Sequence, residues 1–317
     1  MANDRYSLGD VATIDNLDTL SLERRVLDER RALEIGDIVS EAILATHALL
    51  TRGLLVSEIL SIIAEELGFG SYPSGEEVLA ELSGTVSFGH SGLRSFDKVA
   101  FSELYLDRLT KEGIVVSEED FLPSGDVPDS FIYVRNQLSE EAYDVLSQDF
   151  HRPTVAYGHS FKECADAVAS GEVGYMLLPL EERGGTRIGS VAALIHRHDF
   201  KINAVTSVFG YLGDADVKYA LVSKHFTIPT LKDGDEKYIE LRVSDVGSDS
   251  FAELVSVATH FGLSINRVNT VTPSLDGESG CFSLVLRSLT GSLVGLLTYL
   301  TLFLPDAVPV GVYKNLE

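Results

Sequence analysis

The chain has 317 residues, which is enough for two or three compact domains. Its 48 acidic residues against 25 basic ones give a formal net charge of -23, which would repel nucleic acid and anionic membranes, so neither is expected as a partner. A hydrophobic content of 45% with 23% charged residues is ordinary for a soluble globular protein.

Cysteine usage and the chain start indicate an intracellular protein. Cys164 and Cys281 each lie within an apolar pattern, which favours buried free thiols in a reducing, cytoplasmic compartment. The first ten residues have neither the basic region nor the apolar core of a signal peptide. The most apolar run, 293–304, is too short to span a bilayer and ends before Pro305, so we interpret it as a soluble helix.

The N-terminal part of the chain reads as helical. Residues 1 to about 20 look like a polar lead-in, and 22–67 have a helical pattern with a break near Gly53. We expect a packing or dimerisation module here, because the local acidity opposes a DNA-binding helix-turn-helix. Residues 68–75 are expected to be a linker, followed by a helix over 76–82.

A seven-residue pattern occurs twice. Thr-Val-Ser-Phe-Gly-His-Ser at 85–91 returns as Thr-Val-Ala-Tyr-Gly-His-Ser at 154–160. Each copy predicts a short strand, a tight loop and a helix headed by Ser91 or Ser160, whose hydroxyl and free backbone N–H groups suit an anion. Two such loops facing each other would bind both carboxylates of a small diacid. The alternative is two unrelated helix caps.

The middle of the chain predicts alternating strands and helices. We expect strands over 131–134, 154–157, 201–209 and 219–223, the last closing the sheet, and helices over 139–146 and 188–198. A helix over 160–171 has Ser160 as N-cap and Gly171 as its end. The next strand, from Gly174, is expected to stop at Pro179 and open into an acidic, glycine-rich loop. In a parallel sheet such a loop lies where ligands bind.

This central block resembles prephenate dehydratases, in which a phenylalanine-led helix precedes a buried strand and a Glu-Asn-Ser loop. Glu182 and Arg183 stand where the family has asparagine and serine. The matching residues are Phe161, Ala167, Val168, Gly171, Tyr175, Pro179 and Glu181.

The first copy of the repeat is similar to the opening motif of the same family through Phe88, Gly89, Gly92 and Ser95. His90 replaces the family's proline there. The resemblance implies a shortened, periplasmic-binding-protein-like α/β domain. The substrate-binding residues that it implies are Ser91, Gly92, Ser95, Ser160 and Gly185.

The resemblance also implies a reaction, the decarboxylating dehydration of prephenate to phenylpyruvate. In the family a threonine of a Thr-Arg-Phe motif donates the proton, and here Val217, Lys218 and Tyr219 occupy those positions. Valine has no proton to give, whereas Lys218 keeps a positive charge that could meet a carboxylate. Either the activity has been lost, or another group donates the proton. The candidates are His90, His159 and the pair Glu181 and Glu182, and each of them could instead have a structural role.

The C-terminal part has the βαββαβ order of a ferredoxin-like domain, with strands over 238–243, 263–272, 281–287 and 308–313 and helices over 250–261 and 292–303. Residues 262–268 make it similar to an ACT domain, a regulatory module that often forms homodimers or tetramers. The positions aligned with the amino-acid effector site are Asp249, Ser250, Phe251, Asn269 and Thr270. Asp249 would repel a carboxylate, and the family's glycine is absent, which argues against phenylalanine feedback.

We therefore predict an α/β plus α+β protein with three parts: a helical N-terminal segment over 1–75, a prephenate dehydratase-like α/β domain over 76–230 and an ACT-like domain over 231–317. Its expected function is to bind prephenate or a related aromatic-pathway diacid. The alternative is a non-catalytic ligand-sensing or scaffolding paralogue that oligomerises through its ACT domain. Neither a cofactor nor a metal is expected. The LDERR at 27–31 is also similar to the opening helix of chorismate mutase, but no basic constellation for a dicarboxylate follows it.

Overall fold

A computed structural model describes residues 8–67, 97–182, 185–209, 217–229, 236–243, 248–271, 281–288 and 291–316. The chain divides into two compact units, Met1–Val115 and Val116–Glu317, which we call the N-terminal and C-terminal units. The predicted boundaries near 75 and 230 remain a prediction, because 68–96 and 230–235 lie outside the described residues. In the described part of the chain, no helix is both long and apolar enough to cross a bilayer.

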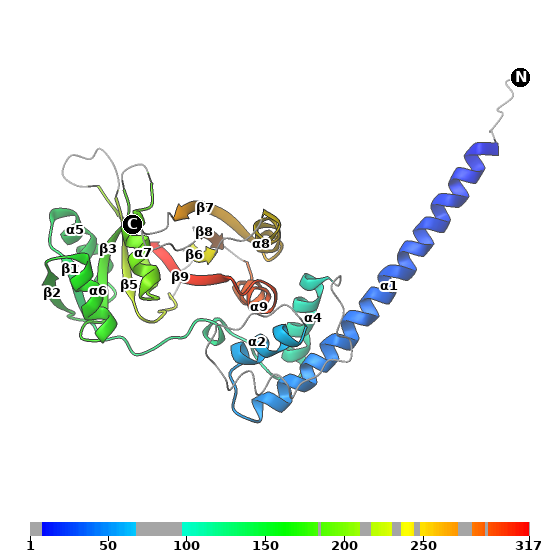
Figure 1. The fold of residues 1–317 in the computed structure, drawn as a ribbon, viewed down its shortest axis with the longest axis horizontal. Coiled ribbons are helices and arrows are strands. Elements are labelled where there is room, and N and C mark those ends of the chain that lie inside the picture. The colour runs from blue at the N-terminus through cyan, green and yellow to red at the C-terminus, as the bar shows by residue number, and fades with distance from the viewer. Residues whose placement is uncertain are drawn as a thin grey trace, which may run out of the picture. The chain divides into compact units, whose positions relative to one another are not determined.

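The N-terminal unit contains three described helices: α1 (Leu8–Leu50), α2 (Val56–Glu66) and α4 (Lys98–Lys111) (Figure 1). The predicted break is confirmed, since Gly53 adopts a left-handed φ of 85° in the turn between α1 and α2. The expected polar lead-in is wrong from Leu8 onward. Apolar residues recur there every three positions without a proline, so nothing ends the helix before Leu50.

The core of the N-terminal unit forms where α2 and α4 pack on α1. Ile38 of α1, Ile59 of α2 and Phe101 of α4 are fully buried. The one deeply buried polar pair described in this core is satisfied, because the Thr46 Oγ1 and Tyr105 Oη atoms lie 2.6 Å apart. Burial raises the pKa of Tyr105, so the pair stays neutral.

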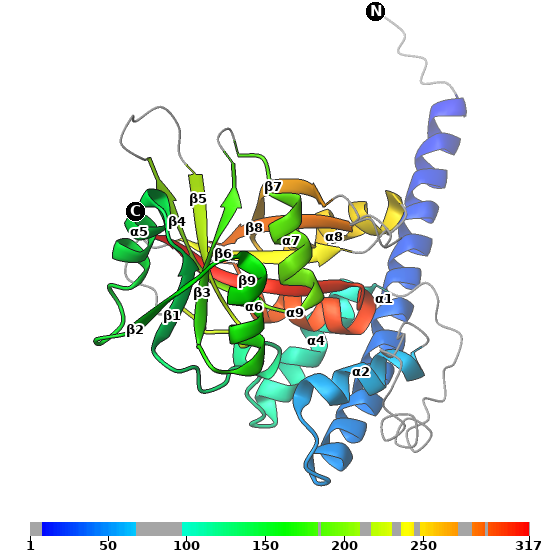
Figure 2. The same cartoon turned by 60° about the vertical axis from the view of Figure 1, so that its left-hand side comes forward.

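The C-terminal unit is built on a sheet of nine strands in the order β2-β1-β3-β5-β4-β9-β6-β8-β7 (Figure 2). The strands are β1 (Ser130–Val134), β2 (Thr154–Gly158), β3 (Tyr175–Glu181), β4 (Lys201–Val208), β5 (Val217–Ser223), β6 (Lys237–Val243), β7 (Leu263–Val271), β8 (Cys281–Ser288) and β9 (Ala307–Leu316). The helices are α5 (Gln137–Leu146), α6 (Phe161–Ser170), α7 (Gly189–Arg197), α8 (Ser248–His260) and α9 (Leu293–Phe303), with a short 3-10 turn, η1 (Glu118–Asp120). The fold of this unit is thus a mixed α/β arrangement.

In the first half of the sheet, β2, β1 and β3 run parallel, whereas β5 pairs antiparallel with both β3 and β4. The expectation that β5 closes the sheet is therefore wrong, because β5 lies inside it. The strand β3 also does not stop at Pro179. It continues to Glu181, and the register with β5 shifts between these two residues, where the proline has no N–H to donate.

In the second half, β9, β6, β8 and β7 pair antiparallel with one another. This is the strand order of a ferredoxin-like arrangement, in which the last strand lies beside the first. These strands do not form a separate sheet, because β9 pairs in parallel with β4 at Ile202 and Gly311. A Cβ atom on Gly311 would lie 2.8 Å from the Ile202 Cβ, so this close approach of strands favours glycine.

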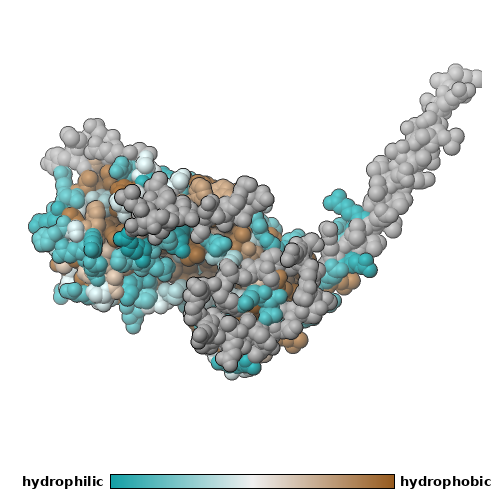
Figure 3. All heavy atoms as spheres, viewed as in Figure 1, coloured by the Kyte–Doolittle hydropathy of each residue, from teal (hydrophilic) through white to brown (hydrophobic). Residues whose placement is uncertain are grey.

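Helices cover both faces of the first half of the sheet (Figure 2). Cys164 and Val168 of α6 and Val191 of α7 share one apolar cluster with Met176 and Leu178 of β3. On the opposite face, Ala142 and Leu146 of α5 pack with Phe131, Tyr175 and Leu221. Hydrophilic side chains prevail around α5 and α6 on the face viewed in Figure 3, as expected for amphipathic helices on a sheet.

Cys164 is expected to be unreactive in the native protein. Its thiol is fully buried, and that burial raises its pKa to about 11. We expect a thiol reagent at mildly alkaline pH to label Cys164 only when urea unfolds the chain, measured in a Cys281→Ser background by mass spectrometry. Between pH 9 and about 11 the unfolded thiol ionises first, so this group should lower stability as the pH rises. Rapid labelling without urea would contradict the buried placement.

Candidate functional site

Glu181, the last residue of β3, is the centre of a cluster of charges. Its side chain is only 5% exposed and accepts a hydrogen bond from Nη1 of Arg267 on β7. The Lys218 Nζ lies 3.7 Å from the same carboxylate, and the Arg187 Nη1 lies 4.0 Å from it. Arg267 Nη1 also donates to the Gly185 carbonyl at 3.1 Å. The acidic loop after β3 is thus tied to the far half of the sheet.

A second carboxylate lies deeper in the same cluster. Glu240 of β6 is 1% exposed and forms an ion pair with the Arg187 Nη2. Ser283 Oγ donates a hydrogen bond to Glu240 Oε1 at 2.6 Å, and the Tyr313 hydroxyl lies 3.4 Å from the other oxygen. Burial and the Glu240 charge raise the pKa of Tyr313 well above its ordinary value, so it remains a neutral donor.

The strand register explains why these residues share one face of the sheet. Glu240 lies opposite Val285, which lies opposite Arg267, and the next polar row is Arg242, Ser283 and Asn269. The helix α7 contacts this polar row through His196, whose Nδ1 lies against Arg242 Nη1. We call this set the polar network; its members are Glu181, Arg187, Lys218, Glu240, Arg242, Arg267, Asn269 and Ser283.

The polar network contains more donors than acceptors. Four of its buried nitrogen atoms have no hydrogen-bond partner among the described residues: Arg187 Nε and Nη1, Arg242 Nε and Asn269 Nδ2. Its four cationic side chains exceed its two carboxylates by two positive charges. Buried donors in folded proteins are almost always paired with protein, water or ligand atoms, so these nitrogens can each take an acceptor, and the surplus of positive charge favours an anionic one. In the described part of the chain, no group of three or more His, Cys, Asp and Glu side chains could hold a metal ion.

The structure brings together some of the residues that the sequence singled out. Glu181, Lys218 and Gly185 lie in or beside the polar network, and Asn269, expected at an effector site, belongs to it as well. Glu182 is exposed, and its N–H donates to the Thr186 carbonyl at 2.8 Å within the turn after β3.

His159 and Ser160 lie elsewhere, at the end of the edge strand β2, with β1 between β2 and β3. Ser160 Oγ accepts a hydrogen bond from the Glu163 N–H at 3.2 Å, and the His159 N–H donates to Glu163 Oε2 at 2.7 Å. These reciprocal bonds cap α6, and Gly171 ends it with a left-handed φ of 78°. The predicted N-cap and C-terminal glycine of this helix are confirmed.

Ser160→Ala is expected to lower the free energy of unfolding by about 1 kcal/mol, because the first turn of α6 loses its side-chain cap. Chemical denaturation measures this. Ser170→Ala is the matched control, since that exposed hydroxyl donates to the Ala167 carbonyl at the end of the helix and caps no N–H group of the first turn. Equal stability of the two variants would contradict the capping role.

The remaining predicted site residues either lie outside the described part of the chain or are described away from this cluster. His90, Ser91, Gly92 and Ser95 lie outside the described residues, as do the side chains of Asp249 and Ser250. Phe251 is half-buried on α8, with its ring centroid 6.2 Å from that of Phe282, and Thr270 is exposed on β7. The convergence of the two repeat copies therefore stays a prediction.

Sequence reasoning missed most of the polar network, including Arg187, Glu240, Arg242, Arg267 and Ser283. The alternation of polar and apolar residues in Tyr-Ile-Glu-Leu-Arg-Val is visible, but it indicates a sheet with one wet face. Glu240 is buried instead, with Arg187 paired to it and with His196, near the end of α7, contacting Arg242 in the next row of the same face.

No protein-family model matches the chain, and no curated protein matches it. Among solved structures, a prephenate dehydratase from Streptococcus mutans has a TM-score of 0.48 at 13% identity over 59% of this chain and 99% of that chain. One from Arthrobacter aurescens in complex with L-Phe has a TM-score of 0.44 at 12% identity over 58% and 89%. GqqA, described as a novel type of quorum quenching acylase, has a TM-score of 0.44 at 14% identity over 59% and 95%. Similarity at this level does not carry an activity over to this chain.

Proposed function

We propose that the chain is a divergent prephenate dehydratase-like protein that binds prephenate, or a related aromatic-pathway diacid, at the polar network without converting it. The observation that carries this proposal is the set of four buried nitrogen donors that have no acceptor in the described part of the chain, within a network that has two surplus positive charges. A dicarboxylate supplies two negative charges, which would balance the surplus positive charge. Its several acceptor oxygens would pair with these N–H donors.

The exposed end of the network offers an entrance for a carboxylate. Lys218 and Arg267 are the more accessible cations, with side chains 27% and 32% exposed, whereas the Arg187 side chain is 5% exposed. A carboxylate that meets Lys218 and Arg267 first would compete with Glu181 for them. Arg242 and Asn269, one row further along the sheet, hold donors for a second carboxylate.

The same geometry disfavours turnover. A proton must reach the leaving hydroxyl of prephenate, and the position that the resemblance assigns to the donor is Val217 at the start of β5. The Glu181 carboxylate is engaged by three cations, Arg187, Lys218 and Arg267. The hydroxyls of Ser283 and Tyr313 are directed to Glu240. The network can therefore hold a dianion, while its described carboxylates and hydroxyls are already engaged and Val217 offers no proton.

Calorimetry with prephenate, alongside absorbance detection of phenylpyruvate, tests this proposal. We expect binding without product, and Arg267→Gln should weaken binding about tenfold or more, because a charge-assisted hydrogen bond is lost. Arg287→Gln is the control, since that arginine pairs with Glu236 at the surface. L-Phe serves as a competitor that carries only one carboxylate.

Product formation above the spontaneous rate would overturn the non-catalytic assignment. Absence of any dicarboxylate binding, or equal binding by the Arg267 and Arg287 variants, would overturn the assignment of the site. Circular dichroism of both variants separates loss of binding from loss of folding.

A second part of the proposal concerns self-association through the ACT-like half, and one observation favours it. The strand β7 is an edge of the sheet, and it exposes the apolar side chains of Ile265 (42%) and Val268 (44%). Such an edge is a surface on which a second copy can pair. Light scattering after gel filtration should give a dimer or tetramer, and Val268→Lys should shift it toward monomer. Val115→Lys, at an exposed valine of the N-terminal unit, should leave the mass unchanged.

A further inference from the structure

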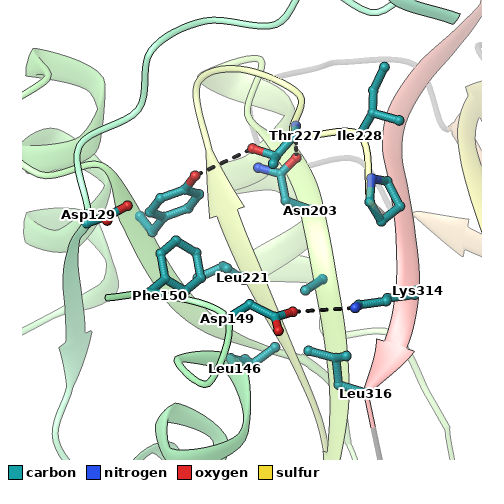
Figure 4. Close-up of a pocket in the computed structure, with 13 residues that line it drawn as sticks. Asp129, Leu146, Asp149, Phe150, Asn203, Leu221, Thr227, Ile228, Lys314 and Leu316 are labelled. Atoms are coloured by element: carbon teal, nitrogen blue, oxygen red, sulfur yellow. Dashed lines mark hydrogen bonds and ion pairs between the residues drawn. The ribbon is translucent and has the colours of Figure 1, made fainter. Parts of the chain in front are cut away.

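A pocket of about 500 Å³ lies in the C-terminal unit and shares no residue with the polar network (Figure 4). It opens on the α5 face of the sheet, between the end of α5, the middle strands β4 and β5, and the last residues of β9. Its size is that of a site for a small organic molecule.

The walls of the pocket are mainly apolar. They are formed by side chains that include Leu146, Phe150, Leu221, Ile228 and Leu316. Phe150 is held against Tyr175, with ring centroids 5.1 Å apart and planes at 73°, and Tyr175 belongs to the buried core. These aromatic rings form a firm wall for a flat or apolar ligand body.

The uncharged polar groups of the pocket are already paired. Asn203 donates to the Ser223 Oγ at 2.8 Å and to the His225 carbonyl at 3.1 Å, and it accepts from the Thr227 N–H at 2.8 Å. The Tyr175 hydroxyl lies 3.4 Å from the Thr227 Oγ1. These bonds fix the shape of the wall and leave charge as the feature that selects a ligand.

The pocket carries one more negative than positive charge. Lys314, whose side chain is 14% exposed, lies 3.4 Å from the carboxylate of Asp149 (Figure 4). Asp129 lines the opposite side, and its carboxylate has no hydrogen bond or ion pair among the described residues. An ammonium group is the natural partner for a carboxylate beside aromatic rings, and the net charge of -23 draws cations to the chain.

We infer that this pocket binds an organic monocation: a primary amine that meets Asp129 and carries an aromatic or apolar body packed on Phe150, Leu221 and Ile228. An anionic ligand of the same shape is disfavoured, because Lys314 is already paired and Asp129 repels it. This site is independent of the proposed diacid site, so either can fail without the other.

Fluorescence anisotropy of tryptamine tests the inference directly. The chain has no tryptophan, so excitation at the red edge of indole absorption reports the ligand alone. Tryptophol is the neutral ligand of matched shape, and indole-3-propionate is the anionic one. We expect tryptamine to bind tightest, and Asp129→Asn should weaken tryptamine about fivefold while leaving tryptophol unchanged, since one partly screened charge pair is lost.

Two further variants sharpen the outcome. Asp126→Asn removes an exposed carboxylate three residues away that does not line the pocket, and it should change nothing. Asp129→Lys should reverse the preference in favour of indole-3-propionate. Equal affinity for all three indoles, no binding of any of them, or the same tryptamine affinity in Asp129→Asn as in the unaltered chain would overturn the inference.

Discussion

Replacing Arg187 with methionine is expected to lower the free energy of unfolding of the C-terminal unit by about 3–5 kcal/mol. Methionine keeps much of the volume but leaves Glu240, which is 1% exposed, without its ion-pair partner. Ser283 and Tyr313 are neutral donors and cannot offset a buried charge. Urea unfolding followed by circular dichroism measures the loss.

A double variant separates the missing pair from the missing side chain. Arg187→Met combined with Glu240→Leu should regain most of the lost stability, because no unpaired charge remains in the sheet. Arg135→Gln is the control for an exposed pair. The Arg135 Nε lies 2.6 Å from the Glu140 Oε1, and both side chains are well exposed. Loss of this pair should lower the free energy of unfolding by at most about 1 kcal/mol. If Arg187→Met and Arg135→Gln lowered the free energy of unfolding by similar amounts, the buried ion pair would contribute no more to stability than the exposed one, contrary to this prediction.

Gly174→Ala is expected to lower the free energy of unfolding by about 3 kcal/mol, through a clash of backbone and not through lost flexibility. A Cβ atom at this position would lie 2.0 Å from the carbonyl oxygen of Pro128, so one of the two chain segments must move. The Gly174 N–H also donates to the Ser130 Oγ at 2.8 Å, a bond that any such movement would strain. Thermal and urea unfolding both measure the effect.

Gly36→Ala is the matched control for that substitution. Gly36 lies inside α1, and a Cβ atom there meets nothing within 4 Å. Alanine is the better helix former by about 1 kcal/mol, so this change should stabilise the N-terminal unit or leave it unaltered. A stable Gly174→Ala protein would contradict the close packing of β3 against the segment before β1.

Much of the local structure could be predicted from the residues themselves. The sequence predicts both ends of the helix α6, because Ser160 and Gly171 act within a few residues of the turns that they cap. The strands β1, β2, β4 and β6 were predicted from their composition and spacing. The start of α1 is the local element that the sequence analysis mispredicts. The many polar residues before position 20 favour a lead-in, but apolar residues recur among them at helical spacing and no proline ends the helix.

The amino-acid sequence by itself determined where most helices and strands form, because caps, breakers and periodicity act over a turn or two of chain. Only the tertiary structure decided that β5 enters the sheet between β3 and β4, and that β4 and β9 join both halves into one sheet. The tertiary structure also decided that Glu181, Glu240 and Arg187 form a buried cluster of ion pairs. Burial of an alternating polar face depends on which distant segment packs over it, and no signal within the strand itself specifies that partner.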